Sequence, residues 1–340
     1  MSLIVPRGFA ASLQAGLEAA RVGNFQKAFN EWSELANDGN AEAQSNLAGL
    51  YFSGVLGESD IKNAVSWFKR AGDQGHAMAA VSLGHIYRTG TGVPGDLVVA
   101  KKWYAIAAEK GIGEAIFFQG ILGLDNIEDP KKIKQALSKV QMAANKNYIP
   151  AKHYIGTLYQ TGRYVTEDIN RALQWYKAAA EAGYAESQMA LANLYLNGET
   201  GEVMLPKAVE WLQKAAAQGQ PRAQYLLGLL AFQGATGKQD DKQAFSWFNN
   251  AAHLWDVNAQ YYLGMSYLEG KGVGKDLMQA YKWFDLAASG EHPDAQVMRA
   301  MVSAQLKPAD RVEAHRQAQL WFDQNHKTPH GHVNLLPHGH

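Results

Sequence analysis

The sequence contains no cysteine and no excess of charge of either sign. The absence of cysteine excludes disulfide bonds, thiolate metal sites and cysteine nucleophiles together. The 32 basic residues are balanced by 32 acidic residues, whereas nucleic acids and anionic membrane surfaces select for proteins with a basic excess. We therefore expect neither nucleic acid nor an anionic membrane surface as the main partner.

Long apolar runs are also missing. No run approaches the roughly 18 to 20 residues that a helix needs to span a bilayer, so no direct membrane insertion is expected. The short apolar patch at residues 3–5 is interrupted by Pro6 and Arg7 and is too short for the core of a signal peptide. The chain as given is expected to be cytoplasmic, and a periplasmic or secreted location is the alternative if a signal was removed before residue 1.

Proline is scarce, with 10 residues against 33 glycines, while tryptophan is frequent, with nine residues. The tryptophans and the small residues recur at a fixed spacing of 36 residues. One column of small residues consists of Ala48, Gly84, Gly120, Gly156, Ala192, Gly228, Gly264 and Ala300. A second column is alanine throughout: Ala64, Ala100, Ala136, Ala172, Ala208, Ala244 and Ala280. A third contains Trp67, Trp103, Trp175, Trp211, Trp247 and Trp283. Such a period is the signature of a repeat architecture.

Each repeat contains two helical patterns. In the segment 221–230, apolar or small residues occupy positions i, i+3, i+4 and i+7, which is typical of one face of a helix. Glycines that suit the left-handed conformation at a helix end follow this first helix: Gly54, Gly90, Gly162, Gly198, Gly234 and Gly270. Aspartates that can cap a helix N-terminus precede the second: Asp60, Asp96, Asp168, Asp240 and Asp276.

The small residue of the first helix is expected to let the second helix approach closely, with the tryptophan of the second helix filling the adjoining space. One helix pair cannot bury such a face alone, so neighbouring pairs must stack. The sequence therefore predicts an all-α fold, an α-solenoid of about nine helix-turn-helix repeats in a right-handed superhelix.

The repeat follows the pattern Ala-x-x-x-Leu-Gly-x-x-Tyr-x-x-Gly-x-Gly-Val-x-x-Asp-x-x-x-Ala-x-x-Trp, and residues 77–112 and 257–292 match it almost throughout. This pattern resembles the Sel-one-like repeat, a relative of the tetratricopeptide repeat. The resemblance implies a scaffold or adaptor that assembles protein complexes, with no shared catalytic residues and no cofactor. We expect a tetratricopeptide-like capping unit at 1–40, seven repeats of 36 residues at 41–292, a degenerate capping repeat at 293–325 and a flexible, histidine-rich tail at 326–340.

The fourth repeat departs most from the pattern. Gly123 replaces the tyrosine, Asn126 a glycine, Lys139 the tryptophan and Asn147 the closing glycine. Drift of the sequence is one interpretation, and a bend or a dedicated docking point is the other. In either case we expect the regular stack to be interrupted here.

Few residues offer chemistry. Residues 90–95 fit the dinucleotide pattern G-x-G-x-x-G, but they follow a helix rather than a strand and a similar segment recurs at 270–274, so we interpret them as a repeat turn. His85 and His153 lack a serine–carboxylate pairing and are interpreted as packing residues. The twin His-x-His elements of the tail could present imidazoles to a metal ion, or they could be incidental, and no metal site is assigned.

The best functional candidate is a stripe of side chains along the first helices. In each first helix these side chains lie three residues before, one residue after and four residues after the small-residue column. By analogy with tetratricopeptide arrays, this stripe lines the concave side of the solenoid. Its candidate partner-binding residues are Phe117, Ile121, His153, Tyr225, Leu229, Phe232, Tyr261 and Met265. Exposed apolar area of this kind marks interaction sites, although the same side chains could instead be buried between repeats.

These observations favour a non-catalytic scaffold that binds its partner through the concave face. An exported adaptor acting with cell-wall or polysaccharide machinery is the alternative, and a metal-dependent enzyme is less favoured because the repeat columns already explain most conspicuous residues.

Deletion of residues 327–340 is expected to leave the melting temperature unchanged, because this segment has no helical period and no core residues. The same deletion should remove most of the affinity for nickel or zinc ions. Calorimetric titration of the full and shortened chains measures this affinity, and undiminished binding would point to an internal site instead.

Overall fold

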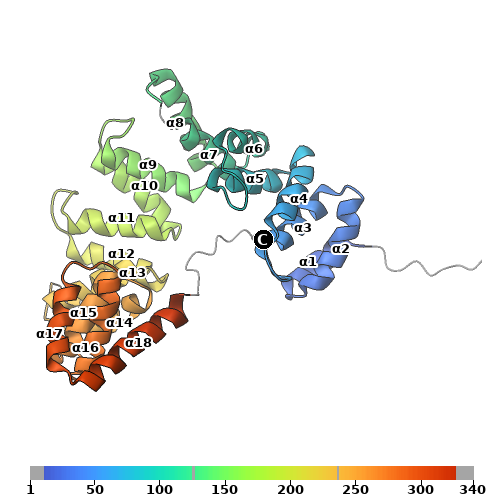
Figure 1. Cartoon of the computed structure of the whole chain (residues 1–340). Coiled ribbons are helices and arrows are strands. Elements are labelled where there is room, and N and C mark those ends of the chain that lie inside the picture. Colours follow the sequence, from blue (N-terminus) through green and yellow to red (C-terminus); the bar gives the residue numbers. More distant parts are fainter. Residues whose placement is uncertain (1–10, 125–126, 236, 327–340) are drawn as a thin grey trace, which may run out of the picture. The chain divides into compact units, whose positions relative to one another are not determined.

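The computed structural model describes residues 11–124, 127–235 and 237–326, and within these ranges the regular secondary structure is helical, with no strand. Eighteen helices follow one another in pairs (Figure 1). The prediction of an all-α fold made of helix pairs is confirmed. Odd-numbered helices are the first of each pair, here called helix one, and even-numbered helices are helix two. The chain divides into two compact units, of which unit 1 ends at Ala151 and unit 2 begins at Lys152.

Unit 1 is built of the first helices of the chain, which Figure 1 draws in blue to green. They are α1 (Leu13–Arg21), α2 (Phe25–Asn37), α3 (Ala41–Ser53), α4 (Ile61–Asp73), α5 (Ala77–Thr89), α6 (Leu97–Glu109), α7 (Gly113–Gly123) and α8 (Pro130–Asn145). The boundary of the unit falls in the first turn of α9 (Ile149–Thr161).

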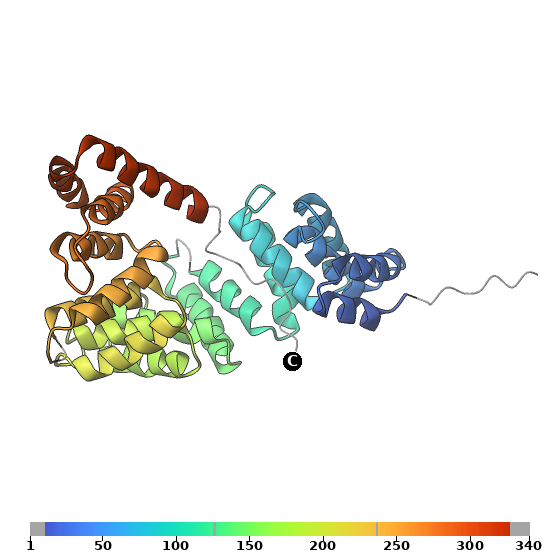
Figure 2. The ribbon, with the colours of Figure 1, turned by 90° about the horizontal axis from the view of Figure 1, so that it is seen from below.

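Unit 2 continues the same alternation through the rest of the described chain (Figure 2). Its further helices are α10 (Ile169–Glu181), α11 (Ala185–Leu196), α12 (Leu205–Ala217), α13 (Pro221–Gln233), α14 (Asp241–His253), α15 (Val257–Glu269), α16 (Leu277–Ser289), α17 (Ala295–Gln305) and α18 (Pro308–His326).

The turn within each pair is fixed by glycine at one end and aspartate at the other. The six glycines of the predicted column all have left-handed φ angles, from 66° at Gly54 to 73° at Gly270. At the other end, the carboxylate of Asp96 accepts hydrogen bonds from the backbone N–H groups of Val98 and Val99 at 2.8 and 3.0 Å. The other four predicted aspartates cap their helices in the same way. Both predictions of helix ends are confirmed.

The small-residue column brings helix one and helix two into close contact, but the ring that fills the space is not the tryptophan. A Cβ atom placed on Gly228 would lie 2.7 Å from the ring of Phe248, the residue after Trp247. Tyr104, Tyr176 and Phe284 take the same place against their own glycines. The prediction that the tryptophan fills this space is therefore wrong.

The tryptophan instead faces the neighbouring repeat. A Cβ atom on Gly72 of α4 would lie 2.7 Å from the indole of Trp103 on α6, so here two successive second helices meet through the tryptophan. The physical reason is the helical rotation of about 100° per residue. Trp103 and Tyr104 are consecutive and cannot both face helix one.

A column of buried glutamines, four residues before the small-residue column, joins successive repeats. Each side chain donates from Nε2 to the carbonyl oxygen eight residues earlier, at the end of the preceding helix two. The bonds are Gln44 to Ala36 (3.0 Å), Gln188 to Ala180 (3.2 Å), Gln224 to Ala216 (3.3 Å) and Gln260 to Ala252 (3.4 Å). Each of these carbonyl oxygens also accepts from the backbone N–H three residues further on, so the glutamine adds a second hydrogen bond that joins the two repeats.

The irregular fourth repeat is the pair α7 and α8. A Cβ atom on Gly120 would lie 2.7 Å from a methyl group of Val140 and 3.0 Å from the carbonyl oxygen of Ala136. A small valine thus replaces the aromatic ring, and the backbone of α8 itself limits the approach. The boundary between the two units falls directly after this pair.

Replacement of Gly228 by valine is expected to lower the free energy of unfolding by about 1–3 kcal/mol, because the added carbons would overlap the ring of Phe248. Gly49 of α3 is the matched control, since a Cβ atom there meets no atom within 4 Å. Gly49→Val should leave stability unchanged or raise it slightly, because valine has the higher helix propensity. Thermal and denaturant melts compare the two variants, and equal melting would contradict the close-approach argument.

Candidate partner-binding surface

Each regular helix one has two covered faces and one open face. On α13, Ala223, Leu227 and Leu230 are buried on one face, and Gly228 lies against its own helix two. The side chains that stay exposed or half-buried lie six before, two before, one after and five after the small-residue column. We call these positions the open face. In unit 2 they are Glu186, Ala190, Asn193 and Asn197 on α11, Arg222, Leu226, Leu229 and Gln233 on α13, and Asn258, Tyr262, Met265 and Glu269 on α15.

The stripe expected from the sequence and the open face share one position, the residue directly after the small-residue column. The other two positions of the stripe lie on a different side of helix one. In unit 1, Ile121 lies on the open face and is half-buried. Phe117 is only 7% exposed, and its ring packs against Phe118 and Tyr148 with centroid distances of 5.3 and 5.4 Å. Phe117 therefore belongs to the packing between α7 and the start of the next repeat.

His153 holds two repeats of unit 2 together. Its Nδ1 atom lies 2.9 Å from the hydroxyl of Ser187, and its ring packs against Tyr176 and Tyr184, each at 5.3 Å. Burial lowers the pKa of His153 below its ordinary value of 6.5, and the nearby carboxylate of Glu186 opposes this only in part. The residue is therefore held neutral within the interface of α9, α10 and α11.

The aromatic residues of α13 and α15 form a joined cluster. Tyr262, which the sequence stripe omitted, stacks on Phe248 at 5.0 Å and 20°. The same ring lies 5.9 Å from Tyr225 and 5.9 Å from Phe232. Tyr225 is only 8% exposed and supports Tyr262 from α13. A signal for Tyr262 was available in the sequence, since it lies two residues before the small-residue column.

Tyr261 and Met265 also lie on α15. The ring of Tyr261 stacks on the imidazole of His292 at 4.2 Å and 7°, so one of its faces is covered. Met265 is half-buried and packs at the edge of the cluster that contains Phe284.

Four apolar side chains of the open face thus lie on two adjacent first helices that ring contacts connect. We call Leu226, Leu229, Tyr262 and Met265 the apolar patch. Cations lie close to the rings beside it: the guanidinium of Arg222 is 4.8 Å from the ring of Tyr225. The amino group of Lys271 is 5.1 Å from the ring of Phe232 and 2.7 Å from the carboxylate of Glu269. The patch is therefore apolar at its centre and charged at its margins.

His85 in unit 1 has a polar partner on each ring nitrogen. Its Nε2 atom lies 2.9 Å from Glu114, and its Nδ1 atom lies 3.0 Å from the hydroxyl of Tyr104. Burial raises the pKa of Tyr104 to about 12. Both ring nitrogens are engaged, and the Tyr104 phenol stays protonated near neutral pH, so the network can fix the packing of α5, α6 and α7.

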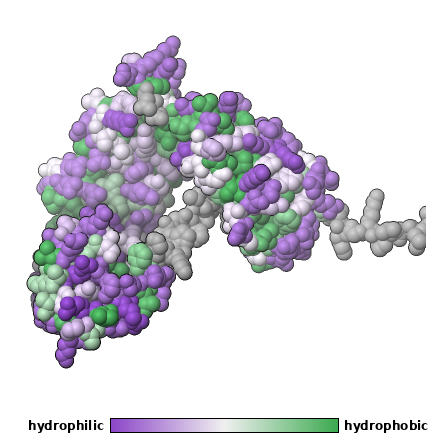
Figure 3. All heavy atoms as spheres, in the orientation of Figure 1, coloured by the Kyte–Doolittle hydropathy of each residue, from purple (hydrophilic) through white to green (hydrophobic). Residues whose placement is uncertain are grey.

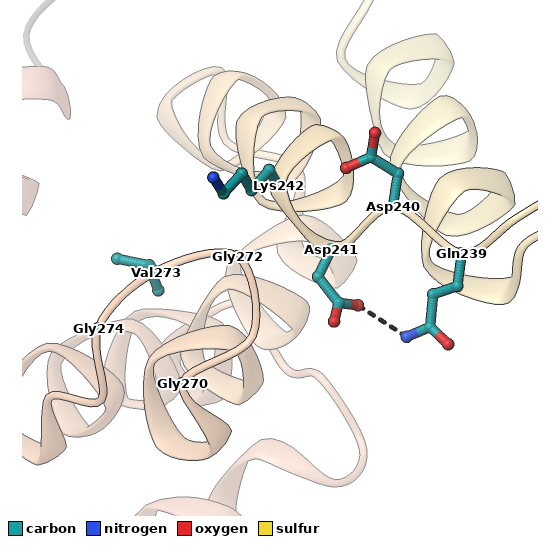
Figure 4. Close-up of a pocket in the computed structure, with 8 residues that line it drawn as sticks. All are labelled: Gln239, Asp240, Asp241, Lys242, Gly270, Gly272, Val273 and Gly274. Carbon is teal, nitrogen blue, oxygen red and sulfur yellow. Dashed lines mark hydrogen bonds between the residues drawn. The ribbon is translucent and has the colours of Figure 1, made fainter.

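The hollow at the G-x-G turn of residues 270–274 is a seam between repeats (Figure 4). A Cβ atom on Gly272 would overlap the carbonyl oxygen of Asp241, and Asp240 already caps α14 through the N–H of Gln243 at 2.9 Å. The two carboxylates would repel a phosphate, and the turn follows α15 rather than a strand. The arrangement fits a repeat turn, as the sequence predicts.

In residues 11–124, 127–235 and 237–326, no group of three or more histidine, aspartate or glutamate side chains could hold a metal ion. The twin His-x-His elements of the tail lie outside the described residues. In the same ranges, every helix is too short or too polar to cross a bilayer.

The comparisons with known proteins agree with this geometry. The Sel1 repeat profile matches residues 41–76, 77–112, 149–184, 185–220, 221–254 and 257–292, and it leaves out the irregular pair of α7 and α8. A solved Sel1 repeat protein from Oxalobacter formigenes is 30% identical, with a TM-score of 0.68 over 85% of this chain and 86% of the other.

Two further solved structures are more distant. The Escherichia coli protein c5321, described as a protective antigen of uropathogenic strains with an SLR fold, is 25% identical, with a TM-score of 0.41 over 91% of this chain and 83% of the other. Yeast Tom70 is 12% identical, with a TM-score of 0.50 over 95% of this chain and 67% of the other. No curated protein matches the chain.

The lowered pKa of His153 predicts a pH-dependent loss of stability. Below its ordinary pKa of 6.5 the unfolded chain takes up a proton at this position more readily than the folded chain does. Stability is therefore highest above that pH and falls as the pH decreases. His153→Asn, which keeps a group able to bond Ser187, should show a smaller fall in melting temperature between about pH 7 and pH 5. Identical pH profiles for the variant and the parent would contradict this assignment.

Proposed function

Because the chain belongs to the Sel1 repeat family, we propose that it is a non-catalytic scaffold that holds a protein or peptide partner on the open face of its first helices. Proteins of this family are generally scaffolds for protein interactions. The finer proposal concerns the place of binding in this chain. We assign its centre to the apolar patch of α13 and α15 in unit 2.

The observation that carries this proposal is the change in character along the open face. On α11 the open positions are Glu186, Ala190, Asn193 and Asn197, which are small or polar. On α13 and α15 the same positions hold the apolar patch, backed by the aromatic cluster around Tyr262. An apolar surface with a polar rim is typical of protein interaction sites.

The side chains of the patch suit a partner segment rather than a small ligand. Tyr262 is held by three rings and loses little conformational freedom on binding. Met265 and the two leucines can adapt to the shape of an apolar side chain. Asn193 and Asn258 flank the patch on the open face, and an amide can both donate to and accept from a peptide backbone.

The residues expected from the sequence then divide into two roles. Leu229 and Met265, with Ile121 in unit 1, lie where a partner can touch them. Tyr225, Phe117 and His153 support the surface from beneath or between the helices. Phe232 and Tyr261 lie at the margins, where Lys271 and His292 already contact their rings.

Truncation of the patch is expected to weaken binding without loss of folding. Peptides that bind the full chain would be selected from a displayed random library, and one of them would be titrated against Leu229→Ala and Tyr262→Ala. Each change should cost about 2 kcal/mol, or about thirtyfold in affinity, if the residue anchors the partner.

Val203→Ala is the control, because Val203 is 57% exposed but lies in a turn away from the open face. This variant should bind the peptide like the parent. Melting temperatures are recorded for all variants. If the patch variants bind as tightly as the control, the partner docks elsewhere and the proposal is wrong.

A further inference from the structure

The last two helices do not form a pair like the others. In the regular pairs, helix two covers the small-residue column of its own helix one. Here α18 packs against α16, as α17 also does, and it leaves α17 largely uncovered. The link between α17 and α18 is residues 306–307, followed by Pro308, whereas the link between α13 and α14 is residues 234–240. This short link lacks the longer turn that, in the regular pairs, folds helix two back onto its helix one, so α18 does not fold back onto α17.

A buried carboxylate holds α18 in its place on α16. Asp285 of α16 is 5% exposed and accepts from Arg299 of α17 at 2.6 Å and from His315 of α18 at 2.7 Å. Farther along α18, the indole of Trp321 packs against Trp283 at 5.4 Å and Trp255 at 4.8 Å. Polar and aromatic contacts therefore fix the position of α18, and Arg299 joins α17 to the same carboxylate.

One face of α17 is consequently exposed. Ala300 is exposed, although Ala48, Ala192 and the glycines at the equivalent positions are all buried. Val297 is 69% exposed, and Ala304 is exposed one turn further on. We call Val297, Ala300 and Ala304 the α17 face. Figure 3 shows green and pale green spheres at the left edge of this part of the molecule, where Figure 1 places α17.

The opposite side of α17 is packed in the regular way. Ala295 and Val302 are fully buried, and Val302 lies in one cluster with Phe284 of α16. Helix α17 therefore keeps the contact with the preceding helix two that every regular helix one makes. What it lacks, among the described residues, is a helix two of its own on the α17 face.

The regular pairs of the same chain define what such a face accepts. Two other first helices also carry alanine in the column. Ala48 is covered by α4, whose buried residues include Ala64, Phe68 and Ala71, and Ala192 is covered by α12, whose buried residues include Ala208, Leu212 and Ala215. In both cases a large apolar side chain lies between an alanine four residues before it and an alanine three residues after it.

We infer that the α17 face binds an amphipathic helix of a partner protein, which takes the place of the missing helix two. The helix that fits has a phenylalanine or leucine flanked by alanines at the spacing Ala-x-x-x-Phe/Leu-x-x-Ala. It continues the interface that six regular pairs of residues 41–292 already make between a small-residue column and a ring or a leucine. The site is separate from the apolar patch, so it does not depend on the proposed function.

A peptide of residues 60–74 is a suitable probe, because it contains α4 and its cap Asp60. The labelled peptide is titrated against the full chain by fluorescence anisotropy. Saturable binding is expected, and a peptide with Phe68→Ala should bind at least tenfold more weakly. In the protein, Ala300→Glu should weaken binding at least tenfold. It should leave the melting temperature unchanged, because Ala300 is exposed. Val312→Glu on α18 is the matched control, since Val312 is 71% exposed and outside the α17 face, and should bind like the parent.

A tethered form covers the case in which the free peptide is too weakly helical to bind, because short isolated helices are marginal in water. Residues 60–74 are attached to the C-terminus through a flexible linker, which raises their effective concentration. The chain has no cysteine, so Ala304→Cys provides a single reactive thiol on the α17 face. The tethered helix should slow maleimide labelling of this thiol at least tenfold, and Phe68→Ala in the tethered copy should restore the rate.

An unchanged labelling rate in the tethered protein would overturn the inference, and so would equal binding of the peptide to the parent and to Ala300→Glu. Self-association of the untethered chain that Ala300→Glu abolishes would also overturn it, because a second copy of the chain would then cover the α17 face. A peptide selected on the apolar patch should bind Ala300→Glu like the parent, so the two proposals fail separately.

Discussion

The close approach of helix one to helix two is the constraint on which the rest of the structure depends. At Gly84, Gly156, Gly228 and Gly264 an aromatic ring of helix two lies only 2.5–2.8 Å from the place that a Cβ atom would occupy. This contact fixes the rotation of helix two. Because the ring faces inward, the preceding tryptophan must point toward the neighbouring repeat, as Trp103 points to Gly72. One short contact therefore determines both the pair and the stacking of pairs.

The polar groups follow from the same packing. Helix ends leave backbone N–H groups without partners inside the helix. The aspartate caps accept from these groups at the exposed starts of the second helices. The glutamine column adds buried bonds between repeats, and Gln74 and Gln218 donate to Gln44 and Gln188 at 2.8 Å. Where Leu254 occupies the equivalent position, the side-chain Oε1 atom of Gln224 is left without a partner. The repeats thus share one plan but differ in how completely each interface is satisfied.

Surfaces for partners arise in this fold from the faces that stacking leaves over. A regular helix one uses one face for the preceding helix two and one for its own, so a single open face remains, and in unit 2 it carries the apolar patch on α13 and α15. Helix α17 is the exception because Asp285 and Trp321 hold α18 elsewhere. The same rule of packing therefore accounts for both the apolar patch and the α17 face.

The sequence by itself determined the all-α fold, the pairing of helices and the helix ends. These depend on local conformation, such as a left-handed glycine or an aspartate beside free N–H groups, and on a period that needs no coordinates. Only the tertiary structure decided that Tyr262 rather than Tyr225 lies open, that Phe248 rather than Trp247 meets Gly228, and that α18 leaves Ala300 uncovered. Adjacent helical residues point about 100° apart, so a shift of one position moves a side chain from the open face to the core. Which side chain is covered depends on contacts with neighbouring helices, and these contacts form only in the folded chain.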